Sequence, residues 1–394
     1  MIRIMKNKFV ITISTIIILL IALLFAEIIN VNNYENVYAK NSQELTSAKG
    51  MAVMEVSSKR VLYSKNEKEK MPMASTTKII TAIVVLENVD DISRVVQIDK
   101  SMTGIEGTSI YLKAGERLTI EELLYGLMLR SGNDAAVALA IATSGSVDKF
   151  VELMNKFCQK VGALDTNIKN PHGLPDDDHY TTAYDLALIS SYALNNEKFA
   201  NIVKTRQKII SNSLSSEENR VLINKNKLLK NMKYSTGIKT GYTKKAGRCF
   251  VGSAEREGMQ IVCVLLHCRP MFEECQDLLE RAFMEYKMIK VVDANNIVGE
   301  SKILGGMKDS VKVATRKDVF LPIKVSEVDS VDIAYDFLHE INAPHSTFES
   351  VGKFDIYASK NLIFSDNLYI IENVEKRLVK RSGRDIVKNF VHAG

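Results

Sequence analysis

The sequence contains no tryptophan and has little proline, histidine or cysteine: six, six and five residues among 394. The cysteine count is odd and the chain is long, so a disulfide framework like that of small secreted domains is not expected. Cys263, His267 and Cys268 lie close together, but their spacing matches no zinc pattern. Cys263 also lies in an apolar run, 261–266, that is typical of a buried strand. We therefore expect the cysteines to pack in the core without a metal ion.

A large excess of charge of either sign is also absent. Lysine and arginine total 52, aspartate and glutamate total 47, and the net charge is +5. This balance is far from that of a nucleic-acid-binding protein, so no nucleic-acid partner is expected, although an anionic membrane surface fits. Hydrophobic residues make up 46% of the chain and charged residues 25%, as in folded proteins with a core. The length fits about two to three domains.

The N-terminus has the pattern of an export signal. Basic residues precede an apolar stretch from Phe9 to Ala26, and Val37–Ala39 ends in a small residue of the kind found at cleavage sites. The apolar stretch is near the lower length limit for spanning a bilayer. Residues 1–39 are therefore predicted to be a signal peptide or an uncleaved signal anchor. Both place the rest of the chain outside the cytoplasm, either secreted or attached to the outer face of the membrane.

Apolar periodicity divides the middle of the chain into helices flanked by strands. Residues 50–63 form a hairpin pattern, and strands are expected near 249–254 and 260–267. We expect these strands to pair in one sheet. Thr119 followed by Glu122 predicts a capping box at a helix start. The expected helices cover 75–87, 119–142 with a break near 131–132, 148–161, 181–194 and 275–288.

The last part of the chain becomes β-rich. Short strand patterns at 311–313, 319–323 and 354–357 predict a small β-domain over residues 291–370. The tail, 372–394, carries mostly basic charges and some apolar residues at helical spacing. It is either a solvated end or a short amphipathic helix on anionic lipid.

The first motif that carries chemistry is Ser75-Thr76-Thr77-Lys78, at the predicted start of a helix. Residues three apart lie on one helix face, so Lys78 can reach the Ser75 hydroxyl. A serine hydroxyl becomes a good nucleophile when a neighbouring base takes its proton. Lysine can act as that base only if burial or a second cation destabilises its ammonium. On its own this pattern is weak, because many helices begin with a capping serine and a solvated lysine.

A second motif, Ser131-Gly132-Asn133, falls at the predicted helix break. There the Ser131 hydroxyl and the Asn133 amide can both point into a cleft. Ser131 could relay a proton between Lys78 and a leaving amine, and Asn133 could hold Lys78 and a substrate carbonyl. Taken alone, this motif is better explained as an ordinary turn with a capping serine and a permissive glycine.

The third motif, Lys239-Thr240-Gly241, lies on a probable edge strand. Lys239 supplies a cation and Thr240 a donor, which together suit a terminal carboxylate. Gly241 lets a ligand backbone approach closely. The backbone N–H groups of Tyr242 and Ser75 could form an oxyanion hole.

Together the three motifs, in this order, form the signature set of penicillin-binding proteins and class A β-lactamases. The chain resembles the low-molecular-mass penicillin-binding proteins, the D-alanyl-D-alanine carboxypeptidases of peptidase family S11. The resemblance covers roughly residues 45–288, and the β-domain with Ala343-Pro344 looks like the family's C-terminal domain. Further matching segments are Tyr63–Asn66, Pro72–Ser75, Leu127–Arg130, Asp134–Ala136, Asn170–Leu174, Tyr180–Leu186, Gly237–Thr243 and Ala246-Gly247.

This resemblance implies an α/β (α+β) catalytic domain of the transpeptidase/β-lactamase type over 40–288, followed by the β-domain. It implies a serine D-Ala-D-Ala carboxypeptidase that shortens the peptidoglycan pentapeptide, is inhibited by β-lactams and needs no metal or organic cofactor. Ser75 would form the acyl-enzyme and Lys78 would be its general base. The implied catalytic residues are Ser75, Lys78 and Ser131, and the implied substrate-binding residues are Asn133, Lys239, Thr240, Gly241 and Tyr242.

Three other functions share these motifs. A class A β-lactamase also needs a glutamate that activates the deacylating water. Glu152 lies in a helical run instead, and loop 170–174 carries no comparable residue. A catalytically inactive envelope protein has no support, since all the motifs are intact. A D,D-endopeptidase that cuts cross-links would use the same residues and stays open. His172 is interpreted as a loop-shaping residue, because Lys78 already fills the role of the base.

Overall fold

The computed structural model describes residues 45–210 and 219–377. The chain divides into a unit of residues 1–47 and a unit that begins at Ala48, and the second of these carries the fold. The predicted signal segment, 1–39, and most of the predicted tail lie outside the described residues. Among the residues that are described, no helix is both long and apolar enough to cross a membrane.

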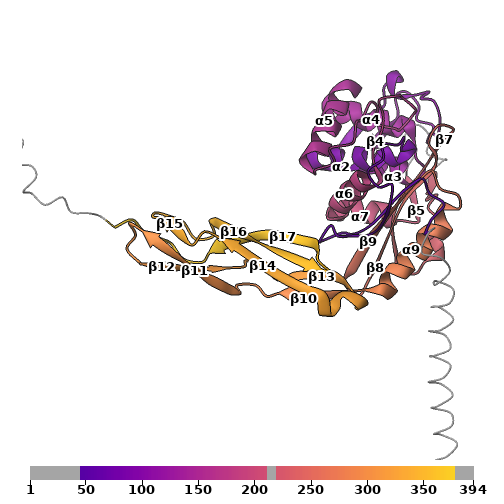
Figure 1. Ribbon diagram of the computed structural model, residues 1–394. Coiled ribbons are helices and arrows are strands. Elements are labelled where there is room, and N and C mark those ends of the chain that lie inside the picture. The colour runs from indigo at the N-terminus through magenta and orange to yellow at the C-terminus, as the bar shows by residue number, and fades with distance from the viewer. Residues whose placement is uncertain (1–44, 211–218, 378–394) are drawn as a thin grey trace, which may run out of the picture. The chain divides into compact units, whose positions relative to one another are not determined.

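The catalytic region is built on an antiparallel five-stranded sheet (Figure 1). The first strand of the chain pairs with the last strand of this region, with Val53 opposite Cys263. The prediction that both ends of the region share one sheet is therefore confirmed. Burial of all five cysteines confirms that they pack in the core. In spatial order the strands are β2 (Val61–Lys65), β1 (Gly50–Glu55), β9 (Met259–Leu266), β8 (Gly247–Arg256) and β7 (Ser235–Thr243).

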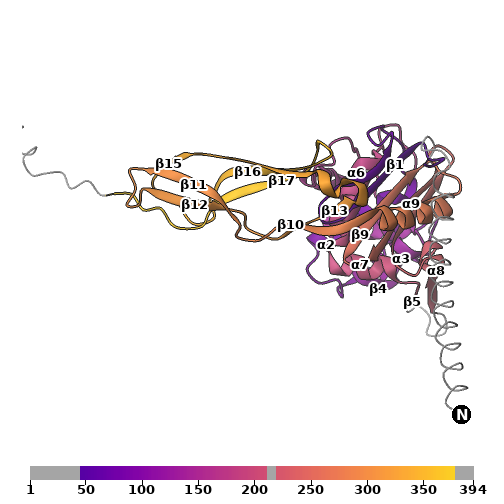
Figure 2. The ribbon, with the colours of Figure 1, turned by 60° about the horizontal axis from the view of Figure 1, so that its bottom comes forward.

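Helices cover both faces of this sheet (Figure 2). The larger group is α2 (Lys78–Asn88), α3 (Ile120–Leu129), α4 (Asn133–Ser144), α5 (Val147–Lys160), α6 (Ala183–Leu194) and α7 (Glu197–Lys204). Helices α6 and α7 of that group contact β1, β9 and β7, while α9 (Met271–Glu285) packs on β8 and β9. A four-residue helix, α8 (Leu228–Asn231), precedes β7.

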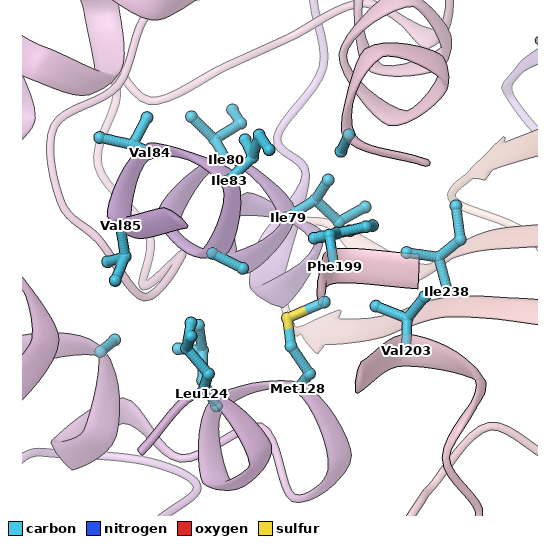
Figure 3. Packing of buried hydrophobic residues seen from close by; sticks show 14 of the residues in the cluster. Ile79, Ile80, Ile83, Val84, Val85, Leu124, Met128, Phe199, Val203 and Ile238 are labelled. Atoms are coloured by element: carbon cyan, nitrogen blue, oxygen red, sulfur yellow. The ribbon is translucent and has the colours of Figure 1, made fainter. Parts of the chain in front are cut away.

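Helix α2 is the centre of the larger helical layer. Its first eight residues are all buried, and it contacts α3, α4, α5, α6 and α7. Figure 3 shows Ile79 near Phe199 and Ile238, while Leu124 and Met128 lie on the neighbouring helix α3. A helix that is apolar on every side is stable only when it is enclosed, so this packing explains its continuous apolar sequence.

The predicted helices are present, with two corrections. Ser75 does not lie in an α-helix but in a 3-10 turn, η1 (Ala74–Thr77), which leads into α2. The last predicted helix ends at Glu285, and Tyr286 begins a strand, because β10 pairs with β13 from that residue onward. The capping box of Thr119 with Glu122 is confirmed by reciprocal hydrogen bonds.

Smaller elements complete the catalytic region. A 3-10 turn, η2 (Lys100–Met102), follows β3 (Val95–Gln97), which pairs with β4 (Arg117–Thr119). A hairpin of β5 (Gln207–Ile210) and β6 (Arg220–Ile223) lies between α7 and α8 and was not predicted.

In the described residues from Tyr286 to Arg377, the C-terminal domain is all β apart from one 3-10 turn, η3 (Val325–Ser330). β10 (Tyr286–Val292) pairs with β13 (Val319–Lys324), and six further strands form a second sheet. Its apolar residues, including Phe354 and Ile356, form a core separate from that of the catalytic region. The predicted fold class is therefore confirmed. The six strands, in spatial order, are β14 (Val331–Phe337), β16 (Ser350–Ala358), β17 (Asn361–Ile370), β12 (Ser310–Ala314), β11 (Ile297–Leu304) and β15 (Glu340–Asn342).

Candidate active site

The predicted nucleophile lies on the tight turn that starts the central helix. Ser75 is partly exposed, whereas Ala74, Thr76 and Thr77 around it are buried. The hydroxyls of Thr76 and Thr77 donate to the carbonyls of Met73 (2.6 Å) and Ala74 (2.8 Å). Ala74 has a left-handed backbone with φ of 50°, which is unfavourable for a residue with a side chain. The sequence therefore presents one hydroxyl to solvent from a turn that local hydrogen bonds hold in place.

Lys78 is fully buried directly below this hydroxyl. Its Nζ lies 2.9 Å from Ser75 Oγ and 2.7 Å from Asn133 Oδ1, and it also donates to the His172 carbonyl. All three acceptors are uncharged. Burial lowers the pKa of Lys78 well below its ordinary value, Lys239 and Lys225 lower it further, and Asp134 opposes them. A lowered pKa favours the neutral amine, which is the form that a general base needs.

The second motif joins two helices at the predicted break. Helix α3 ends at Leu129, Ser131 is buried with a left-handed φ of 65°, and α4 begins at Asn133. The Asn133 amide bridges the site, because its Oδ1 accepts from Lys78 and its Nδ2 donates to the Glu106 carbonyl at 2.5 Å. The structure thus brings Ser75, Lys78 and Asn133 together directly.

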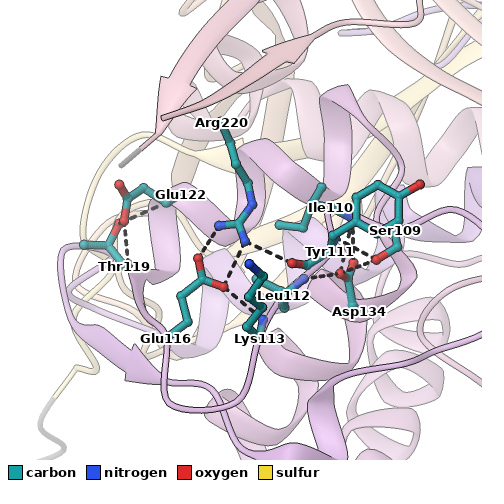
Figure 4. Close-up of polar contacts among 10 residues, drawn as sticks. All are labelled: Ser109, Ile110, Tyr111, Leu112, Lys113, Glu116, Thr119, Glu122, Asp134 and Arg220. Carbon is teal, nitrogen blue, oxygen red and sulfur yellow. Dashed lines mark hydrogen bonds and ion pairs between the residues drawn. The ribbon is translucent and has the colours of Figure 1, made fainter. Parts of the chain in front are cut away.

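A buried carboxylate beside this motif was missed by the sequence analysis. Figure 4 shows Asp134 accepting from the Ser109 hydroxyl (2.5 Å) and from the backbone N–H groups of Ile110 (3.0 Å) and Leu112 (3.0 Å). These bonds hold the loop before β4 against α4. The same loop supplies the carbonyl of Glu106 to Asn133, so Asp134 supports the site indirectly. An acidic residue in the first turn of a helix was the available signal.

A second carboxylate fixes the far end of that loop. Glu116 is fully buried, accepts from the Lys113 N–H at 3.0 Å and forms a two-point contact with the guanidinium of Arg220 (Figure 4). Arg220 belongs to β6 and also donates to the Tyr111 carbonyl at 3.0 Å. The unpredicted hairpin therefore helps to hold the loop that carries Glu106.

The third motif lies on β7, which is an edge strand as predicted. Lys239 is buried, and its Nζ donates to the Thr240 carbonyl at 2.9 Å. Burial, together with the nearby cation of Lys225, lowers the pKa of Lys239 to about 7. Strand β7 contacts the turn η1, so the third motif lies beside the first, and Lys239 in turn lowers the pKa of Lys78.

At Gly241, β7 passes close to the backbone of the nucleophile turn. A Cβ atom at this position would lie 3.0 Å from the backbone nitrogen of Ser75 and 3.1 Å from that of Thr76. Only glycine leaves this space free, so the requirement at this motif position is steric. Thr240 is half-buried and Tyr242 is 56% exposed, with its ring 5.8 Å from the guanidinium carbon of Arg248.

The loop before α6 closes the other side of the site. The carbonyls of Pro171 and His172 accept from Thr81 Oγ1 (2.6 Å) and from Lys78. Gly173 has a φ of 86°, and a Cβ there would overlap the Ala74 carbonyl. The His172 ring accepts from the Leu174 N–H at 3.3 Å, which fits the expected loop-shaping role. Burial, with Lys78, lowers the pKa of His172 to about 4, so the ring is uncharged at neutral pH.

Comparison with known proteins identifies this arrangement. The model of the D-alanyl-D-alanine carboxypeptidase family, peptidase family S11, matches residues 37–269, more than half of the chain. The chain belongs to this family. A second family model, the C-terminal domain of penicillin-binding protein 5, matches residues 286–376. The predicted resemblance is therefore confirmed, and the protein is a serine D-Ala-D-Ala carboxypeptidase.

Individual relatives agree with this assignment. D-alanyl-D-alanine carboxypeptidase DacF of Bacillus subtilis is 30% identical over 79% of this chain and 82% of its own length. The crystal structure of penicillin-binding protein 5 from Haemophilus influenzae has a TM-score of 0.75 at 27% identity, covering 85% of this chain and all of that one. A structure of the Streptomyces K15 DD-transpeptidase has a TM-score of 0.58 at 28% identity and matches 61% of this chain and 98% of its own.

In residues 45–210 and 219–377, no group of three or more histidine, cysteine, aspartate or glutamate side chains is arranged to hold a metal ion. The carboxypeptidase site contains a hydroxyl, two buried amines with lowered pKa values and backbone N–H groups beside an edge strand. These groups are the ones that nucleophilic acyl transfer requires.

Proposed function

We propose that this carboxypeptidase removes the terminal D-Ala from peptidoglycan pentapeptides through an acyl-enzyme on Ser75. The observation that carries the proposal is the 2.9 Å contact between Ser75 Oγ and the buried Nζ of Lys78. An amine whose charged form is destabilised by burial can take the hydroxyl proton as the oxygen attacks.

In the first step, neutral Lys78 accepts the proton of Ser75, and Oγ attacks the carbonyl carbon of the penultimate D-Ala. The N–H groups of Ser75 and Tyr242 stabilise the resulting oxyanion, and the Ser75 nitrogen borders the space that is kept free at Gly241. Asn133 holds Lys78 in place through its Oδ1.

In the second step, the amide bond breaks and the leaving D-Ala nitrogen takes the proton from Lys78, directly or through Ser131. The terminal carboxylate is held by protonated Lys239 and by the Thr240 hydroxyl. A carboxylate next to Lys239 favours its charged form, so substrate binding raises the pKa from its free-enzyme value of about 7. Water then attacks the ester, and the tetrapeptide is released.

The same groups account for β-lactam inhibition. A β-lactam presents a reactive carbonyl to Ser75 and a carboxylate to Lys239 and Thr240, so it acylates the serine as the peptide does. The β-lactamase alternative is not favoured, because the relatives compared with this chain are named D-alanyl-D-alanine carboxypeptidases.

We place the enzyme outside the cytoplasm, at the outer face of the membrane. Basic residues before the apolar stretch Phe9–Ala26 support export, and the basic tail, 372–394, supports contact with anionic lipid. Flotation with anionic vesicles tests the second point. A chain lacking 372–394 that floats as completely as the intact chain would contradict it.

The direct test of the reaction uses a peptide that ends in D-Ala-D-Ala and measures released D-Ala. We expect Ser75→Ala to release none and to lose labelling by fluorescent penicillin. The control Ser57→Ala, at an exposed serine of the β1–β2 turn, should behave like the parent enzyme. Faster cleavage of a dimer of cross-linked stem peptides than of the linear peptide would instead indicate a D,D-endopeptidase.

A further inference from the structure

A buried histidine outside the signature motifs connects the loop before α6 to the nucleophile turn. His179 is 3% exposed, and its Nδ1 accepts from the backbone N–H of Lys169 at 3.0 Å. Its Nε2 lies 2.8 Å from the hydroxyl oxygen of Thr77. None of the three signature motifs includes this residue.

The partners of the ring assign its tautomer. Because Nδ1 must accept from a backbone N–H, the proton of the neutral ring is on Nε2, which therefore donates to Thr77 Oγ1. The Thr77 hydroxyl in turn donates to the Ala74 carbonyl at 2.8 Å. The three hydrogen bonds run in one direction, from Lys169 through His179 and Thr77 to Ala74.

The ring remains in this form at neutral pH. Burial lowers the pKa of His179 to about 4, against the opposing effect of Asp176. The structure gives His179 no hydrogen bond to Ser75 or Lys78 within the described part of the chain, so it does not touch the reacting atoms. It can act on catalysis only through Thr77.

The end point of this chain of bonds is the residue that sets the position of the nucleophile. Ala74 immediately precedes Ser75 and is held at a φ of 50°. A strained conformation of this kind persists only when its surroundings fix it. The Thr77 hydroxyl holds the Ala74 carbonyl from one side, and Gly173 packs against it from the other.

We propose that His179 is a positioning residue for acylation: by donating to Thr77 it holds the 3-10 turn that keeps Ser75 Oγ beside Lys78. This inference rests on the proposed role of Ser75 as the nucleophile. It assigns to the His179–Thr77 pair the task of maintaining kcat, while substrate affinity depends on Lys239 and Thr240 on β7.

Two substitutions separate the two hydrogen bonds of the ring. The amide nitrogen of His179→Gln can take the place of Nε2 and donate to Thr77. His179→Asn can keep the acceptor for Lys169 but is too short to reach Thr77. We expect the Gln variant to keep kcat and the penicillin acylation rate within about threefold, and the Asn variant to lose about 10- to 100-fold in both, with KM little changed.

A second pair tests the same contact from its other side. Thr77→Ser keeps the hydroxyl and should retain activity, whereas Thr77→Val should lose as much as His179→Asn. The double variant of His179→Asn and Thr77→Val should be no worse than either single one, because both break one unit. This pair also decides the matter if a histidine variant does not fold.

A loop control distinguishes positioning from general destabilisation. Asn155 on α5 binds both backbone groups of Ile168, each at 2.9 Å, and so supports the same loop without touching Thr77. Asn155→Leu should lower Tm but leave kcat per correctly folded molecule unchanged. If kcat follows Tm across all these variants, or if His179→Asn keeps full kcat, the inference is wrong. Residual acylation in Ser75→Ala would instead overturn the proposed function.

Discussion

Two buried lysines determine the electrostatics of the site at the scale of single residues. Lys78 and Lys239 are both fully enclosed, and each has a lowered pKa chiefly because burial destabilises an ammonium ion. Their tasks require opposite charge states. Lys78 must be neutral to accept a proton, and Lys239 must be charged to hold a carboxylate.

The pH dependence of kcat/KM follows from this division. Activity should rise as pH increases through the lowered pKa of Lys78, and it should fall above about 7 as free Lys239 loses its proton. Because the two lysines interact, the two limbs of the pH profile give apparent pKa values that belong to the pair and not to either residue alone. Lys239→Arg keeps its charge and should remove the alkaline limb. A kcat/KM profile for this variant that still falls above neutral pH would contradict the assignment.

Gly241 is the other residue whose chemistry can be tested alone. Gly241→Ala places a methyl group against the backbone nitrogens of Ser75 and Thr76, where the oxyanion must bind. We expect the penicillin acylation rate to fall by about 100-fold, as when an oxyanion-hole donor is removed, with little change in Tm. Gly50→Ala on β1 is the matched control, since its close contacts are with the flexible end of Met71, and the Asn66 carbonyl is at an ordinary contact distance of 3.6 Å. Equal rates in the two variants would refute a steric role.

At the scale of elements, the first turn of α4 and the loop before β4 act together. Asp134 accepts hydrogen bonds from the N–H groups of Ile110 and Leu112. The ion pair of Glu116 with Arg220 connects the loop to β6. The loop then positions the carbonyl that orients Asn133. A movement of this loop would therefore shift the Asn133 amide and, through its hydrogen bond, Lys78.

Asp134→Asn tests this connection. The amide NH2 cannot accept, so the N–H of either Leu112 or Ala135 loses its acceptor, and the free energy of unfolding should fall by about 1–3 kcal/mol. Acylation by penicillin should slow as Asn133 loses its fixed orientation. Denaturant unfolding and acylation rates measure the two effects. The variant Glu116→Gln, farther from Asn133, should lose stability with a smaller loss of rate, and the reverse order would count against the proposed path.

Elements with strong local patterns could be predicted from the sequence, as could the pairing of the terminal strands and the meeting of the three motifs, but most other long-range contacts could not. Thr119 and Glu122 mark a helix start through bonds three residues apart, and the break at Ser131 follows from adjacent residues. The 3-10 turn at Ser75 was missed because it depends on Ala74 being held by a distant loop. The roles of Asp134 and His179 depend on partners that are near only after folding, so the one local signal was the place of Asp134 in the first turn of a helix.

At the scale of the whole molecule, the apolar core of the helical layer around α2 is separate from the apolar core of the β-domain. The apolar residues of the first core lie within residues 52–266, and those of the β-domain core lie within residues 289–374. All the site residues belong to elements around the first core. The K15 DD-transpeptidase of Streptomyces is matched almost completely by 61% of this chain, so a chain of similar extent exists as a folded protein.

A truncated chain of residues 40–288 should therefore retain activity on soluble peptide. We expect kcat/KM for D-Ala release to stay within about threefold of the full chain, because the catalytic core is intact. Near-ultraviolet circular dichroism establishes that the fragment is folded, and Ser75→Ala in the fragment gives the background. A folded but inactive fragment would show that the β-domain contributes to the site.

The pairing of β1 with β9 has a consequence for how the enzyme is made. The opposed residues Val53 and Cys263 are 210 positions apart, so the ribosome has delivered nearly all of the catalytic region before the central strands can meet. Pairing over such a separation is slow, which prolongs the interval in which the new chain has no fixed structure. A nascent or interrupted polypeptide consequently has no hydrolytic capacity, and the chain becomes an enzyme only after its synthesis has passed this strand.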